Sequence, residues 1–192
     1  MGAAAGYANN RFGSPWASSL VSEWVFSLAL VLLLFVMGFA FGADKEAAVK
    51  LKKAGLRILV VPLAVASGSL VGGLIGGLVL GLNVFGCMTV SAGFGWYTLV
   101  GPLVGDLLGA EWGMLGFVVN FLRELLTIVT VPFAVKVDKL VPVAFGGATA
   151  MDTTLPVITR YCGDETLITA FSSGFTLSLA APFTITAMAT LT

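Results

Sequence analysis

Charged residues are scarce in this chain, and histidine is absent. Only 10% of its 192 residues are charged, whereas 58% are hydrophobic. A soluble domain of this size carries about a quarter charged residues. The lack of histidine removes the commonest side chain for proton transfer and metal binding at neutral pH. The formal net charge is zero, which gives no support for a nucleic-acid partner. We therefore expect no enzyme, metal site, cofactor or nucleic-acid ligand.

The chain has only two cysteines, and its first residues do not have the pattern of a signal peptide. Cys87 and Cys162 show no zinc-binding spacing, and we interpret them as buried packing residues. Residues 1–19 lack the basic start and continuous apolar stretch of a signal peptide. We interpret residues 1–23 as a polar lead-in and residues 24–192 as a membrane domain.

Long charge-free runs dominate the rest of the chain. Residues 24–43, 58–105 and 166–192 contain no charged side chain. About 20 apolar residues match the hydrocarbon thickness of a bilayer. These runs predict an all-α polytopic membrane protein with about six membrane segments.

Basic residues between the first two segments orient the chain. Half of its lysines and arginines lie within residues 44–57, which the positive-inside rule places in the cytoplasm. The N-terminus is then outside. The second span, about residues 56–81, returns outward and contains five glycines that we interpret as a close-packing face: Gly68, Gly72, Gly73, Gly76 and Gly77.

Two later segments combine glycine and proline in a way that disfavours a continuous helix. They cover about residues 84–108 and 140–159, and a smooth span of about residues 113–135 separates them. A last span covers about residues 166–191, for which Asp164 is a plausible N-cap. Broken helices persist in membranes only where protein or a water-filled cavity satisfies the freed backbone groups.

The two broken segments resemble each other at a shift of 54 residues. The shift superposes Gly93 on Gly147 and Pro102 on Pro156. It also superposes several residues further on: Gly109 on Gly163, Glu111 on Glu165, Phe117 on Phe171, Phe121 on Phe175 and Leu125 on Leu179. We interpret this as a possible internal repeat. Paired interruptions of this kind point to a ligand site.

Two topologies remain open at this stage. Six full crossings would leave Lys136 and Lys139 outside. Four crossings with two re-entrant segments would place both lysines inside and make the repeats inverted, as charge bias favours. Both arrangements leave the C-terminus outside.

Glu124 lies near the middle of the smooth span. Asn120, Arg123, Glu124 and Thr127 fall on one stripe of this otherwise apolar helix. A charge at mid-bilayer costs several kcal/mol unless it is paired or hydrated, so Glu124 is a functional candidate. The alternative is a structural pair between Arg123 and Glu124.

Asp152 lies in the second broken segment among Thr149, Thr153 and Thr154. Two carboxylates suit a cationic amine, a coupling ion, or both, and hydroxyls with freed amides suit a carboxylate. Pro156 is expected to make the chain near Leu155 non-helical, which would free backbone groups beside Asp152 for such a site. The alternative is that Asp152 only caps the following half-helix.

Aromatic residues and a further acid in the first broken segment also have alternatives. Trp96 and Tyr97 fit either a site or an interfacial anchor, and Asp106 fits a structural role.

Three motifs resemble the lysine exporter family often called LysO. They are Ser91-Ala-Gly-Phe-Gly-Trp-Tyr-Thr-Leu-Val-Gly101, Asn120-Phe-Leu-Arg-Glu124 and Gly146-Gly-Ala-Thr-Ala-Met-Asp-Thr-Thr-Leu-Pro156. The resemblance covers roughly residues 25–192. It implies that the membrane domain exports L-lysine and toxic lysine analogues from the cytoplasm, and it assigns the acidic motif positions to Glu124 and Asp152.

The resemblance sets the expected function and site. We expect antiport of lysine against protons or another cation, with Glu124 and Asp152 alternating between substrate amine and coupling ion. The other candidate substrate contacts are Asn120, Thr149, Thr153, Ser91 and Tyr97. Full-length members look longer at the N-terminus, so a homo-oligomer or a separate membrane subunit is expected to complete the path. The alternatives are another small cation or amino acid as substrate, a channel, and a non-transporting scaffold.

Overall fold

The computed structural model describes residues 59–192 and seven positions of the first span: Leu28, Val31, Leu32, Phe35, Val36, Phe39 and Ala43. The chain divides into two units, Met1–Ala48 and Val49–Thr192. The seven positions of the first unit are helical and exposed, and Phe35 and Phe39 stack with ring centroids 6.5 Å apart. The expected charged loop, residues 44–57, and the polar lead-in lie outside the described residues.

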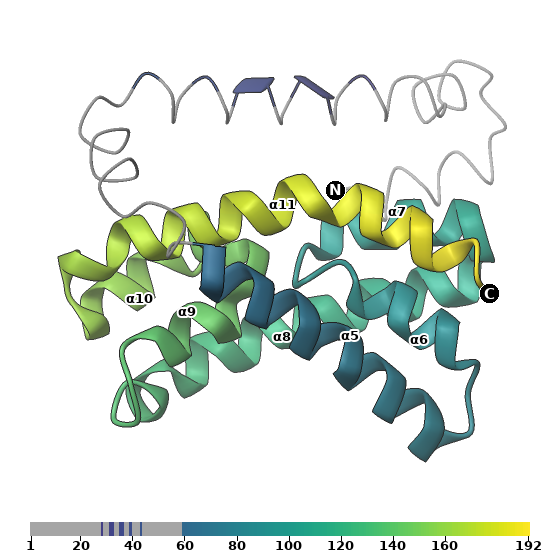
Figure 1. Ribbon diagram of the computed structural model, residues 1–192, viewed down its shortest axis with the longest axis horizontal. Helices are drawn as coiled ribbons and strands as arrows, with labels where there is room; N and C mark the ends of the chain where they lie inside the picture. The colour runs from purple at the N-terminus through teal and green to yellow at the C-terminus, as the bar shows by residue number, and fades with distance from the viewer. Residues whose placement is uncertain (1–27, 29–30, 33–34, 37–38, 40–42, 44–58) are drawn as a thin grey trace, which may run out of the picture. The chain divides into compact units, whose positions relative to one another are not determined.

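The described elements of the second unit are all helices (Figure 1). Its helices are α5 (Val60–Leu80), α6 (Val84–Ser91), α7 (Tyr97–Leu108), α8 (Ala110–Ala134), α9 (Leu140–Gly146), α10 (Leu155–Cys162) and α11 (Leu167–Ala189). Two 3₁₀ turns, η2 (Gly147–Met151) and η3 (Asp164–Thr166), precede α10 and α11. No strand occurs among the described residues.

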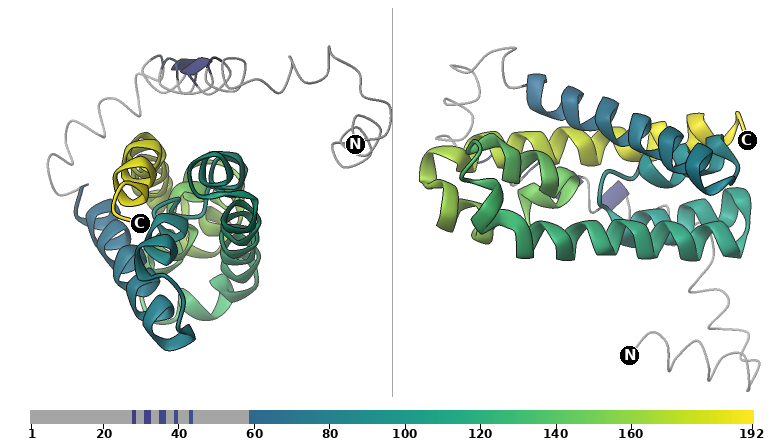
Figure 2. Two further views of the ribbon diagram at one scale, coloured as in Figure 1. Left: turned by 90° about the vertical axis from the view of Figure 1, so that its right-hand side faces the viewer. Right: turned by 90° about the horizontal axis from the view of Figure 1, so that it is seen from below.

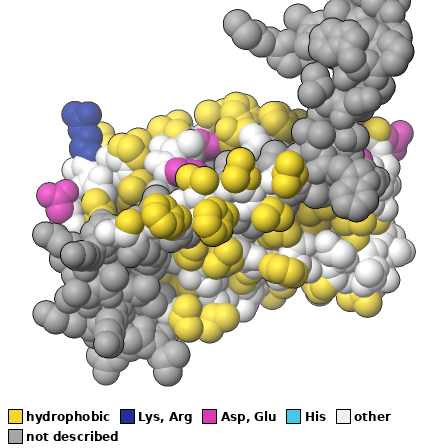
Figure 3. Space-filling view, turned by 90° about the horizontal axis from the view of Figure 1, so that it is seen from above, with side chains coloured by type: hydrophobic (Ala, Val, Ile, Leu, Met, Phe, Trp, Pro, Cys, Tyr) yellow, Lys and Arg dark blue, Asp and Glu magenta, His cyan; other side chains and the backbone are white. Residues whose placement is uncertain are grey.

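Within the described residues, three stretches are long and apolar enough to cross a membrane. They are Val60–Leu80, Ala110–Ala134 and Asp164–Ala189. Figure 2 shows the long helices nearly end-on in its left view and along their length in its right view. Hydrophobic side chains cover much of the face shown in Figure 3, as expected for helices in lipid. The protein is therefore a multi-pass membrane protein, and its described part is all-helical.

The first broken segment forms a hairpin of α6 and α7 beside the N-terminal part of α8. Near the start of α6, a side-chain carbon at Gly86 would fall 2.5 Å from the Trp112 ring. Near the end of α7, Gly105 packs against Gly113 of α8. A side-chain carbon added to Gly113 would lie 2.7 Å from the Cα of Gly105. Both outer ends of the hairpin therefore lie at the same end of α8, and its tip lies deeper.

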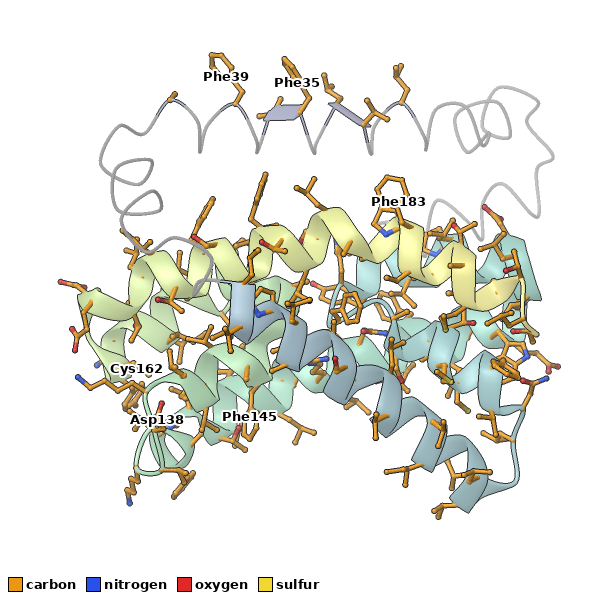
Figure 4. The ribbon with its side chains drawn as sticks, viewed as in Figure 1. Phe35, Phe39, Asp138, Phe145, Cys162 and Phe183 are labelled. Atoms are coloured by element: carbon orange, nitrogen blue, oxygen red, sulfur yellow. The ribbon has the colours of Figure 1, made fainter. Side chains whose placement is uncertain are left out.

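The second broken segment forms a hairpin of α9, η2 and α10 at the other end of the bundle. Lys139, just before α9, pairs with Glu165, just after α10. Asp138 and Cys162, at the outer ends of the two arms, are labelled at this end in Figure 4. Gly174, about a third of the way along α11, approaches the tip so closely that an added carbon would lie 2.6 Å from the Met151 nitrogen. The tips of both hairpins thus lie near the middle of the long helices.

Several local predictions are corrected. Asp164 is not the N-cap of the last span, because the chain turns at Gly163 and Thr166 occupies that position without a capping side chain. Leu155 is helical, because Pro156 stands in the first turn of α10, where its missing N–H costs no hydrogen bond. Pro102 is likewise inside α7, and the first interruption is at residues 92–96.

The glycine face of α5 is only partly a packing face. Gly73 and Gly77 contact α6 so tightly that an added carbon would fall within 2.9 Å of a neighbouring atom. At Gly68, Gly72 and Gly76 such a carbon would meet nothing within 4 Å. The two sets lie about 100° apart around the helix, so only one can face α6.

Candidate functional site

The two interruptions touch each other at the centre of the second unit. Ala148 donates its backbone N–H to the Phe94 carbonyl oxygen at 2.9 Å. The chain turns sharply on both sides of this bond, with positive φ at Phe94, Gly95 and Gly147. The crossing of the two tips, which we call the crossover, is therefore the point at which freed backbone groups from both hairpins meet.

Asn120 of α8 satisfies the first interruption. Its side-chain oxygen accepts the Gly95 N–H at 2.7 Å, and its amide donates to the carbonyl oxygens of Val90 and Gly116 at 3.0 and 2.9 Å. Asn120 is only 2% exposed, so these bonds replace water for a buried helix break. Its observed role is to hold the backbone of the first interruption.

Arg123, one turn further along α8, holds the second hairpin. Its guanidinium donates to the carbonyl oxygens of Phe145 and Ala144 at 3.0 and 3.1 Å, and to the Ser69 hydroxyl at 2.9 Å. A cation suits the C-terminal carbonyls of α9, because they carry the negative end of the helix dipole. The alternative of an Arg123–Glu124 pair is wrong, since the only ion pair among the described residues joins Lys139 and Glu165.

Glu124 faces the interior of the bundle without a partner. The residue is 7% exposed, and its buried Oε2 atom has no hydrogen bond to any of the described residues. The expected polar stripe of α8 is otherwise confirmed, because Asn120 and Thr127 are also buried. A buried carboxylate oxygen without a donor is costly, so this position has capacity for a cationic or protonated partner.

Tyr97 packs on the middle part of α8. Its ring lies edge-on against Phe117 and Phe121, with centroids 5.3 and 5.4 Å apart. The interfacial-anchor alternative fits Tyr97 poorly, because it lies beside an interruption at the level of mid-α8.

Asp152 lies at the end of the second interruption and is exposed. Its Oδ1 atom accepts from the Thr153 backbone N–H at 2.6 Å and faces the Thr153 hydroxyl at 3.4 Å. The alternative that Asp152 caps α10 is wrong, because the N-cap of that helix is Thr154 and makes no side-chain capping bond. The Asp152 carboxylate therefore keeps acceptor capacity toward the outside of the hairpin tip.

Two expected substrate contacts point elsewhere. The Thr149 hydroxyl donates to the Gly146 carbonyl oxygen at 2.9 Å and faces the Thr154 hydroxyl, so it stabilises the interruption itself. The Ser91 hydroxyl faces α5, where an added carbon on Gly73 would approach it to 2.6 Å. Neither side chain is grouped with Glu124 by a described contact. Both stay predictions as substrate ligands.

Sequence reasoning missed other polar groups near the crossover. Ser69 on α5, which the sequence did not single out, accepts a hydrogen bond from Arg123 at 2.9 Å. The Ser172 and Ser173 hydroxyls on α11 are buried without a hydrogen-bond partner. Both cysteines are buried and free, which confirms their interpretation as packing residues. No cluster of potential metal ligands occurs among the described residues.

The fold and the crossover define a multi-pass membrane protein that is built around interrupted helices. The model of the lysine exporter LysO family matches residues 1–189, and the chain belongs to that family. The resemblance drawn from the three motifs is thereby confirmed.

Two relatives show how much of a family member the chain represents. The lysine exporter LysO of Escherichia coli (strain K12) is 35% identical over 158 residues, which are 81% of this chain and 52% of the relative. A putative lysine exporter of Haemophilus influenzae is 29% identical over 157 residues, which are 80% of this chain and 78% of the relative. The chain thus spans about half the length of the first relative. No solved structure matches it.

Proposed function

We propose that the chain exports L-lysine and lysine analogues from the cytoplasm in exchange for protons or another cation. The observation that carries the proposal is the buried Glu124 carboxylate, with an unpartnered oxygen beside the crossover. Because Arg123 donates to α9 and Ser69, it does not neutralise this carboxylate. A lysine ammonium or a coupling cation can therefore occupy the same oxygen at different stages of the cycle.

Asp152 is the second carboxylate of the proposed path. It is exposed at the end of the second interruption. We propose that the exposed Asp152 receives the substrate ammonium first and that the buried Glu124 holds it at mid-depth, with Thr153 and Tyr97 nearby. The attraction between a cation and a carboxylate is stronger in a low-dielectric interior than in water. This supports movement of the ammonium from the exposed Asp152 to the buried Glu124.

We propose that the two hairpins are re-entrant and form inverted repeats. Similar backbone geometry supports the repeat: Gly109 and Gly163, 54 residues apart, have φ/ψ of 101°/161° and 93°/158°. The ring pairs Phe117–Phe121 and Phe171–Phe175 are also both stacked, with centroids 5.9 and 6.3 Å apart. Hairpins that enter from opposite ends suit alternating access to a central site.

The orientation follows from the basic residues at one end of the bundle. Lys136 and Lys139 lie between α8 and α9, at the end where the second hairpin opens. The positive-inside rule makes this end cytoplasmic, so the second hairpin faces the cytoplasm and both termini are outside. A homo-oligomer or an additional membrane subunit remains part of the proposal, and the mass of the purified complex tests it.

Transport in proteoliposomes tests the function. We expect saturable movement of labelled lysine that is driven by an imposed pH gradient or by a counter-cation gradient. Glu124→Gln should insert and fold but lose export, because the amide cannot balance an ammonium charge. Glu111→Gln, an exposed acid on the same helix, is the matched control and should transport normally. A normal rate in Glu124→Gln would show that this carboxylate is not part of the mechanism.

A further inference from the structure

A groove lies on the face of α8 that carries Arg123, about 100° around the helix from Glu124. It has a volume of about 730 Å³ and is formed by α5, α8 and the end of α9. Leu126 and Phe145 border it and are exposed, and Phe145 is labelled on α9 in Figure 4. On the α5 side of the groove, a side-chain carbon added to Gly68 would meet no atom within 4 Å. The groove is therefore large enough for a small organic molecule.

Arg123 is the only charged residue among the described residues that line the groove. The other polar side chains in the lining are the hydroxyls of Ser69, Thr127 and Thr130, and no acidic residue is present. A guanidinium has five N–H donors. Its three bonds, to Phe145, Ser69 and Ala144, use one N–H on each nitrogen. Each terminal nitrogen thus keeps one N–H without a partner among the described residues, and an oxyanion can accept both.

The depth of Arg123 restricts the kind of anion. It is 13 residues from Ala110 and 11 from Ala134, so it lies about 20 and 16 Å from the two ends of α8 at 1.5 Å per residue. A lipid phosphate remains at the membrane surface and does not reach that depth. A carboxylate on a small molecule that travels through the protein does.

We propose that Arg123 and this groove form the subsite for the α-carboxylate of the transported amino acid. The inference rests on the proposed function, because it needs a zwitterionic amino acid as substrate. Arg123 and Glu124 are adjacent on α8 and point about 100° apart. Glu124 takes the cationic end of the substrate on one side, and Arg123 takes its anionic end on the other.

Binding of matched ligands to matched variants tests the subsite. The ligands are L-lysine and L-lysinamide, in which a neutral amide replaces the carboxylate. Their affinities are measured by displacement of labelled lysine from the detergent-purified protein. We expect the wild type to bind lysine at least about ten-fold more tightly than lysinamide, as for a charge-assisted pair. Arg123→Gln should remove this preference while it leaves lysinamide affinity within about three-fold. Arg160→Gln, which changes an exposed arginine on α10, should retain the preference.

A second variant addresses the groove without disturbing the bonds of Arg123. Gly68→Leu fills open space beside Arg123, whereas Gly76→Leu fills open space outside the groove. We expect Gly68→Leu to weaken lysine binding at least about ten-fold and Gly76→Leu to leave it unchanged. Normal lysine binding in Gly68→Leu would overturn the subsite, even if Arg123→Gln fails to fold.

The remaining outcomes separate the subsite from the function. An equal loss for lysine and lysinamide in Arg123→Gln would assign Arg123 a structural role only and overturn the subsite. The same holds for a wild type that binds both ligands equally, although lysine export would stand. No lysine binding in the wild type would overturn the proposed function, and the subsite with it.

Discussion

Replacing Gly147 with alanine should destabilise the protein by acting on the crossover. Gly147 has φ 60° and ψ −124°, a conformation that residues with a side chain rarely adopt. An added carbon would also lie 2.2 Å from the Phe94 carbonyl oxygen and 2.8 Å from a terminal nitrogen of Arg123. Strain at such a backbone costs about 1–3 kcal/mol, and overpacking of a filled site costs about 1–3 kcal/mol more.

The assay is thermal unfolding of the detergent-purified protein. A loss of about 2–6 kcal/mol corresponds to a fall in Tm of about 4–24 °C, at about 2–4 °C per kcal/mol for a chain of this size. Gly72→Ala is the matched control, because an added carbon there meets nothing within 4 Å. The control should keep its Tm or raise it slightly, since alanine favours a helix by about 0.5–1 kcal/mol over glycine. Equal Tm values for the two variants would refute the close packing of the two hairpin tips.

Three further predictions concern other parts of the site. Asn120→Leu should lower the free energy of unfolding by about 1–3 kcal/mol, because it leaves the buried Gly95 N–H without an acceptor; chemical denaturation measures this, and an unchanged midpoint would contradict it. Asp152→Asn should reduce the lysine-induced rise in Tm more than Asp106→Asn does, and equal rises in the wild type and Asp152→Asn would exclude Asp152 from the substrate site. A cysteine placed beside Lys139 should react with an impermeant label only from the cytoplasmic side, whereas labelling only from outside would favour six full crossings.

The sequence was sufficient to locate the interruptions and the polar stripe of α8. Glycine and proline weaken a helix locally, so their clustering predicted both broken segments, and the 3.6-residue period placed Asn120, Glu124 and Thr127 on one face. These features depend on neighbouring residues along the chain. They are therefore visible without knowledge of the tertiary structure.

The direction of Arg123 could not be predicted in this way. Its partners Ala144, Phe145 and Ser69 are 21, 22 and 54 residues away in sequence, and the pairing depends on how α5 and α9 pack against α8. The glycines of α5 present the same difficulty. Four-residue spacing is common to both groups of glycines, Gly73–Gly77 and Gly68–Gly72–Gly76. Only the position of α6 decides which group is buried.

The contact between Phe94 and Ala148 has a mechanical consequence. The two hairpins are anchored at opposite ends of the second unit, and this backbone hydrogen bond joins their tips. Gly147 and Gly95 bring the tips too close for either to slide past the other without a change in backbone conformation. A movement of one hairpin must therefore carry the other with it or break the bond. The crossover is thus the contact through which a displacement of one hairpin tip would reach the other.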